Sequence, residues 1–133
     1  MENQDLIIAG ELRRKYFFFM LGLTLAILGV TITTFKPYAL MVLNYIEISC
    51  WLLLVIAGFA IIMCIRHTIA YHTSVGILTS DSYDWTSRKL AKQGKPRSVK
   101  YAHVFSIVFY TSFALAFSGL MFNRLLVAIM SLH

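Results

Sequence analysis

Three long stretches of the sequence contain no Lys, Arg, Asp or Glu, and they restrict the chain to a small set of folds. They are Tyr16–Phe35, Ile48–Ile65 and Tyr101–Asn123, with lengths of 20, 18 and 23 residues. A helix needs roughly 20 apolar residues to cross the hydrocarbon core of a bilayer. A helix that packs on a soluble core carries a polar stripe, and these stretches show none. The sequence therefore predicts an all-α integral membrane protein with three transmembrane helices.

The charged residues argue against a soluble enzyme and against a nucleic-acid-binding protein. Only 14% of the residues are charged, whereas a typical soluble domain has roughly 25%. The net charge is +6, but the basic residues flank the apolar stretches and do not alternate with aromatic residues as on a nucleic-acid surface. Three spans leave no room for a separate catalytic domain. We expect a single transmembrane domain over residues 1–133, with no enzymatic activity, no cofactor and no nucleic-acid partner.

The connections between the spans are predicted to differ in length. We place the spans at about 16–35, 40–65 and 101–123. Pro37 disfavours helical geometry in the residue before it, so the first two spans should form a tight antiparallel hairpin. Residues 66–100 should be a loop that contains one short helix, over about 82–93, ended by Gly94-Lys95-Pro96. No small-residue cleavage site follows the first span, which we expect to be retained.

The placement of the basic residues predicts the orientation in the membrane. Residues 13–15 are all basic and seven Lys or Arg lie within residues 66–100, whereas the opposite side has only Lys36 and Arg124. Because cytoplasmic segments carry an excess of Lys and Arg, the N-terminus and residues 66–100 should be cytoplasmic and the C-terminus outside. The small size and compact connections suggest the inner membrane of a bacterium.

Small residues recur at helical spacing in each span, a pattern that lets membrane helices approach closely. In the first and third spans the spacing is i, i+4, i+7 and i+11, and in the second the small residues form two adjacent stripes. We expect these stripes to be helix contacts, with the second span between the other two. The residues are Gly22, Ala26, Gly29 and Thr33 in the first span, Cys50, Ala57, Gly58 and Cys64 in the second, and Ser112, Ala116, Gly119 and Asn123 in the third.

Glu47 is the only acidic residue near the middle of an apolar run, the one that extends over residues 38–65. A carboxylate at the centre of a span costs about 3 kcal/mol on translocon scales, and much less at the interface. Glu47 is either a protonatable group in a pore or pocket, or half of an interfacial ion pair. We favour the ion pair, with Arg124 as the partner in preference to Lys36. Asn44 and Asn123 lie at the same level and are further candidate members of this polar site.

Other chemistry has weak support. No phosphate loop, zinc spacing or nucleophile motif is present. The histidines His67, His72, His103 and His133 leave a haem-binding redox anchor as a remote alternative. Hydroxyl groups on the first and third spans could line a path in an oligomer, although such hydroxyls more often bond their own helix. The first alternative to a non-catalytic subunit is an oligomeric channel, carrier or membrane-permeabilising effector with Glu47 near the path, and the redox anchor is the second.

The function expected from these patterns is non-catalytic. We predict a subunit or accessory protein of a membrane assembly, which would pair with a second copy of itself or with another membrane protein. The basic segment should contact anionic lipid headgroups or a partner, because each basic residue near the surface contributes about 1 kcal/mol of binding. The residues expected to make this contact are Arg88, Lys89, Lys92, Lys95 and Arg97.

Overall fold

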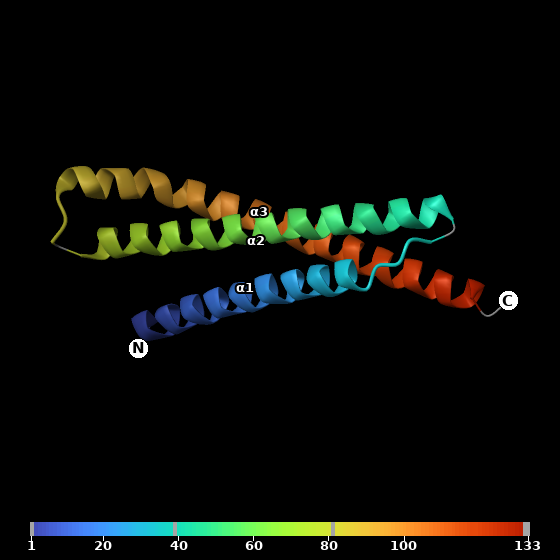
Figure 1. The fold of residues 1–133 in the computed structure, drawn as a ribbon. Coiled ribbons are helices and arrows are strands. Elements are labelled where there is room, and N and C mark those ends of the chain that lie inside the picture. The colour runs from blue at the N-terminus through green and yellow to red at the C-terminus, as the bar shows by residue number, and fades with distance from the viewer. Residues whose placement is uncertain (1, 39, 81, 132–133) are drawn as a thin grey trace.

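The structure is a computed structural model that describes residues 2–38, 40–80 and 82–131, with side chains from Ile8 onward. Three α-helices contain nearly all of these residues: α1 (Glu2–Thr33), α2 (Met41–Thr79) and α3 (Trp85–Met130). Figure 1 shows the helices lying side by side with their axes roughly aligned. Along its course α3 starts on one side of α2, crosses it and ends on the side where α1 lies.

All three helices are longer than a bilayer requires. At 1.5 Å per residue, helices of 32, 39 and 46 residues extend about 48, 58 and 69 Å, whereas the hydrocarbon core is about 30 Å thick. Each helix is apolar enough over part of its length to cross a membrane. Large apolar side chains such as Phe19, Phe59 and Phe122 stand exposed on the outside, which soluble monomers rarely tolerate over so wide a surface. The all-helical membrane fold expected from the sequence is therefore the fold observed.

The prediction of a loop over residues 66–100 is wrong. α2 continues to Thr79 and α3 begins at Trp85, so only residues 80–84 connect them. The two helices touch along the whole of this extension, which explains why both remain helical beyond their apolar parts. From the core outward, the contacts are Cys64 Sγ to the Ala102 carbonyl oxygen (3.4 Å), the His67 ring on the Tyr101 ring (5.3 Å between centroids), Lys95 Nζ over the Tyr71 ring (5.7 Å), and Arg88 Nη2 to the Ser80 carbonyl oxygen (2.6 Å).

The Gly94-Lys95-Pro96 sequence does not end a helix as predicted. Pro96 lies inside α3 on its exposed side, where it removes one backbone hydrogen bond and crowds the preceding turn. On an exposed face water can bond the carbonyl that loses its partner. Ala91 and Ser98, on either side of Pro96, are both buried, so packing carries α3 through the proline. The short helix expected over residues 82–93 is therefore the first part of α3.

Most of the buried core lies between α2 and α3. One cluster includes Ile61, Cys64 and Phe109; among the described side chains of α1, Phe17 is its one buried member, with Met20 and Leu21 packed against it. The fully buried residues of a second cluster, Cys50, Leu54, Ala116 and Leu120, come from α2 and α3, and α1 adds the partly buried Ile27 and Leu28. α1 is thus held to the rest of the chain more lightly than α2 and α3 are held to each other.

Most of the predicted small residues of α2 and α3 lie in the interface between these two helices; the exception is Gly58, where an added Cβ would meet no atom within 4 Å. Ala57, Cys64 and Ala116 are fully buried. Gly119 and Cys50 approach so closely that a Cβ added to the glycine would lie 2.6 Å from the cysteine Sγ. This contact needs glycine because no other residue leaves the space empty. Both cysteines are free thiols.

The small-residue stripe of α1 lies on the opposite face from the one that packs. A Cβ on either of its glycines would meet no atom within 4 Å, and the stripe is roughly 180° around the helix from the buried Phe17 and Thr24. The interpretation of this stripe as a seam between helices of one chain is therefore wrong, because α1 docks through its larger side chains instead. The exposed residues are Gly22, Ala26, Gly29 and Thr33.

Candidate functional site

The polar site is built around Glu47, whose side chain is completely buried. Glu47 lies in the second turn of α2, on the same face as the buried Leu43 and Cys50. At 1.5 Å per residue it is about 9 Å from the start of the helix. α2 therefore carries the carboxylate toward α3, at the end of the protein where the connection between α1 and α2 passes.

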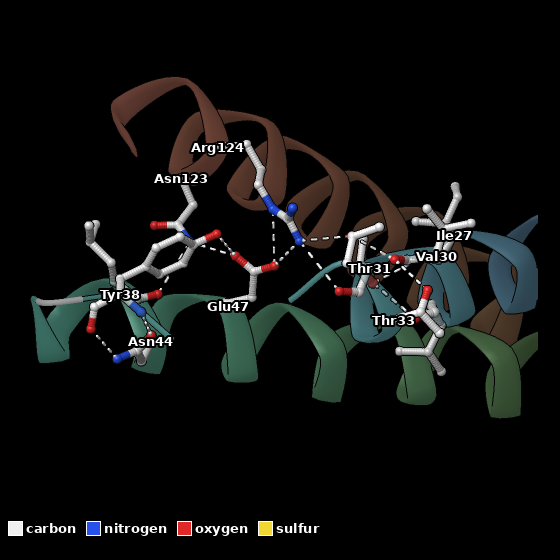
Figure 2. Close-up of polar contacts among 12 residues, drawn as sticks. Ile27, Val30, Thr31, Thr33, Tyr38, Asn44, Glu47, Asn123 and Arg124 are labelled. Carbon is white, nitrogen blue, oxygen red and sulfur yellow. Dashed lines mark hydrogen bonds and ion pairs between the residues drawn. The ribbon is translucent and has the colours of Figure 1, made fainter. Parts of the chain in front are cut away.

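The Glu47 carboxylate accepts four hydrogen bonds, all from neighbouring side chains (Figure 2). Arg124 donates to Oε1 twice, from Nη2 at 2.6 Å and from Nε at 3.2 Å. Oε2 accepts from Asn123 Nδ2 at 2.8 Å and from the Tyr38 hydroxyl at 3.1 Å. A carboxylate has about four lone-pair sites, so its capacity is filled. The predicted ion pair between Glu47 and Arg124 is present, whereas Lys36 is exposed.

Arg124 also reaches α1. Its Nη2 lies 3.4 Å from the Thr31 carbonyl oxygen and 3.4 Å from Thr34 Oγ1. Thr31 lies in the last turn of α1, where carbonyl groups lack partners within the helix and a cation is favoured by the helix dipole. One guanidinium group therefore links the start of α2 to the end of α1.

Asn123 completes the link between α2 and α3. Its Nδ2 donates both to Glu47 and to the Leu43 carbonyl oxygen, the second at 3.2 Å. Both neighbours are acceptors, so this orientation of the amide is the only favourable one. Its Oδ1 is buried and has no hydrogen-bond partner among the described residues, a cost that the two donated bonds offset.

Asn44 does not bond Glu47, although its position in the sequence suggested that it belongs to the polar site. Its side chain holds the connection between α1 and α2: Oδ1 accepts from the Tyr38 backbone N–H at 2.8 Å, and Nδ2 donates to the Tyr38 carbonyl oxygen at 3.0 Å. The Tyr38 ring is thereby directed at Glu47. Burial, and next the charge of Glu47, raise the pKa of the Tyr38 phenol, so the phenol stays neutral and can donate.

The basic residues predicted to contact lipid or a partner do not form one surface. Arg88 and Lys95 are half-buried against α2, where they bond Ser80 and cover Tyr71. The ammonium of Lys89 lies 5.1 Å from the centre of the Trp85 ring. Lys92 and Arg97 are exposed. The first two residues thus contribute to the α2–α3 pairing, and the other three are open to solvent or headgroups.

The hydroxyl groups considered as pore-lining are mostly engaged by their own helices. Six of them donate to a backbone carbonyl three or four residues earlier, namely those of Thr24, Thr31, Thr33, Thr34, Thr111 and Ser112. Such bonds satisfy the hydroxyl without a neighbouring helix or water. These hydroxyls therefore have partners within their own helices, and that of Thr34 also accepts from Arg124 Nη2.

Of the described histidines, His67 and His72 contact other side chains and backbone, and His103 is exposed. The His67 ring stacks on Tyr101 and also on Phe105, with centroids 5.8 Å apart for the second pair. The His72 ring fills the space beside Gly10 on α1, at 2.7 Å from the place of a Cβ. His133 lies outside the described residues. Within residues 2–131, gaps excepted, no group of three or more His, Cys, Asp or Glu side chains is arranged to hold a metal ion.

Tyr38 is a member of the site that sequence patterns did not single out, and Thr31 and Thr34 were considered as pore-lining residues but not as partners of Arg124. The sequence signal of Tyr38 was faint, because it resembled an ordinary interfacial tyrosine. The hydrogen bonds of Glu47 and Arg124 form a cluster that connects all three helices at one end of the protein.

No family model, no curated protein and no solved structure matches the chain.

Proposed function

We propose that this protein is a non-catalytic subunit of a membrane assembly, in which α1 packs against a second copy of the chain. This proposal rests on the light attachment of α1 to the other helices. On its small-residue face, a Cβ added at Gly22 or Gly29 would meet no atom within 4 Å. Membrane helices associate mainly through close packing at such small residues. The filled hydrogen-bond capacity of Glu47 supports a role for that residue in holding the protomer together and not in transport.

Replacing Gly29 with Ile should weaken self-association. The larger side chain would keep two α1 helices apart, and a loss of close packing should lower the dimer fraction severalfold. Fluorescence transfer between differently labelled chains, measured in vesicles at several protein-to-lipid ratios, reports this fraction. Gly76→Ile is the matched control, because Gly76 is also exposed in a helix and a Cβ there meets no atom within 4 Å.

Two results would contradict the proposal. One is transfer no higher than that of unrelated monomeric proteins at equal density. The other is ion conduction by the purified protein in liposomes that Glu47→Gln alters, since this would make Glu47 part of a path. Equal loss of transfer in Gly29→Ile and Gly76→Ile would place the contact elsewhere than on the α1 stripe.

We further propose the topology expected from the charges, with α1 and α2 forming an antiparallel hairpin across a bacterial inner membrane. Residues 13–15 and the basic part of the α2–α3 hairpin would be cytoplasmic, and Glu47 would lie near the outer surface. The excess of Lys and Arg at one end supports this orientation. The exposed Lys89, Lys92 and Arg97 are the side chains best placed for anionic headgroups.

Reporter fusions test this topology. A phosphatase that is active only outside the cytoplasm should be active when fused after Pro37 and inactive when fused after Ser82. The reverse pattern, or activity at both sites, would contradict the orientation. A cytoplasm-dependent reporter fused at the same two positions provides the control for expression.

A further inference from the structure

A cleft between α1 and α3 opens beside the Glu47 cluster and has a volume of about 210 Å³. α1 and α3 have few close contacts, because both helices pack mainly on α2, although the Tyr110 hydroxyl donates to the Tyr16 hydroxyl at 3.2 Å farther along the bundle. Three polar residues, Thr31, Thr34 and Arg124, line one end of the cleft. The remaining lining is apolar and comes from both helices: Ile27 and Val30 on α1, and Phe117, Leu120 and Met121 on α3.

The cleft therefore has a polar end and an apolar end, arranged along the helix axes. From Thr34 to Ile27, or from Arg124 to Phe117, is seven residues, which corresponds to about 10 Å. The polar end lies beside the connection between α1 and α2, and the apolar end lies toward the middle of both helices. In a bilayer this places the polar end near the interface and the apolar end in the hydrocarbon, the same order as in a lipid molecule.

Arg124 retains donors that could bind an anion. Glu47 takes its Nε and Nη2, and Nη2 also faces Thr31 and Thr34. Among the described residues nothing accepts a hydrogen bond from Nη1, and the side chain is 36% exposed. Guanidinium groups bind phosphate with strong, charge-assisted hydrogen bonds. Because Glu47 cancels the charge of Arg124, the exposed Lys36, two residues beyond Thr34, supplies the surplus positive charge at this end.

We propose that the cleft binds one anionic phospholipid, with its phosphate on Arg124 Nη1 and one acyl chain between α1 and α3. An apolar cleft open to the bilayer fills with hydrocarbon, since water gains no partners there. The Nη1 donors hold the phosphate, which all phospholipids carry, and the surplus positive charge of Lys36 favours a headgroup without the compensating choline cation. This site is distinct from the basic surface at the other end of the protein, and it does not depend on the proposal that α1 forms a dimer.

Photolabelling tests the site. The purified protein is placed in phosphatidylcholine vesicles doped with phosphatidylglycerol that carries a diazirine on its acyl chain, and labelled peptides are mapped after irradiation. Peptides that contain residues 27–34 and 117–124 should be labelled together. Phosphatidylcholine with the same diazirine chain should label them severalfold less, because its choline cation is repelled by the exposed Lys36.

Variants separate the chain site from the headgroup site. Val30→Phe should fill the cleft and lower labelling of both peptides severalfold. Ile32→Phe is the matched control, because Ile32 is an exposed residue of α1 roughly 200° around the helix from Val30. Arg124→Lys keeps a cation for Glu47 but removes Nη1, so it should lower labelling by both lipids, whereas Lys36→Ala should remove the preference for phosphatidylglycerol while chain labelling persists.

Three results would overturn the proposal. They are equal labelling by the two lipids in the unmodified protein, equal labelling in Val30→Phe and Ile32→Phe, and labelling confined to peptides outside the cleft. If Arg124→Lys does not fold, the comparison of the two lipids and the two phenylalanine variants still decides the matter. Competition by a free fatty acid at equal concentration would show that a carboxylate headgroup, and not a phospholipid, is the occupant.

Discussion

Replacing Arg124 with Ala should destabilise the protein by about 3 kcal/mol, the lower end of the range for breaking a buried ion pair. The carboxylate of Glu47 is fully buried and would keep only the donors from Asn123 and Tyr38. We take the lower end because the Arg124 side chain is 36% exposed. The same change removes the contact to the end of α1. Thermal unfolding in a mild detergent, followed by circular dichroism, measures the loss.

Glu47→Gln combined with Arg124→Ala should be more stable than Arg124→Ala alone, because the double variant no longer buries an unpaired charge. The coupling energy expected for such directly bonded residues is about 0.5–3 kcal/mol. Lys36→Ala serves as the control, since Lys36 is the other cation at this end of the protein but is exposed. We expect its effect to stay within about 0.5 kcal/mol. Additive effects of the Glu47 and Arg124 changes would contradict the pairing.

Gly119→Ala should destabilise the α2–α3 interface by about 1–3 kcal/mol, the usual cost of overfilling a packed core. The new methyl group would lie 2.6 Å from Cys50 Sγ, so either the cysteine must rotate or the helices must separate. Cys50→Ala removes the atom that clashes, and the double variant should recover most of the lost stability. The unfolding assay used for Arg124 also serves here.

Gly22→Ala and Gly29→Ala provide matched controls on α1. Neither new methyl group would meet an atom within 4 Å, so within one chain both changes should be neutral, or stabilising by up to about 1 kcal/mol through helix propensity. A loss of stability in Gly119→Ala no greater than in these controls would argue against the close approach of α2 and α3. Failure of Cys50→Ala to compensate would argue that the clash lies with another group.

The Glu47–Arg124 pair could be predicted because an isolated carboxylate in an apolar run requires a partner, and few cations are available at its level. The face of α1 that packs could not be predicted in the same way. In water a helix turns its apolar face inward, but in a bilayer lipid and protein are equally apolar. The small-residue face of α1 and the face with Phe17 therefore look equivalent in the sequence, and only the fit against α2 separates them.

The long α2–α3 hairpin is a second feature that local sequence patterns could not predict. Gly94 and Pro96 are reliable breakers of isolated helices, but here the part of α3 around them packs on α2, as the Lys95–Tyr71 contact and the buried Ala91 and Ser98 show. Those contacts join residues such as His67 and Tyr101, which are far apart in the sequence. The position of Tyr38 in the polar site has the same origin, because it depends on how Asn44 folds the short connection before α2.

The continuity of α2 and α3 past their apolar parts makes the hairpin a rigid spacer. Residues 66–79 of α2 are helical and extend about 21 Å at 1.5 Å per residue. The turn at residues 80–84 is therefore held at a set height above the end of the apolar segment. A partner protein bound at this turn would be kept at that height, and tilting of the bundle in the membrane would move the partner sideways. The length of the two helices beyond their apolar parts thus sets the distance from the membrane at which a partner protein would bind.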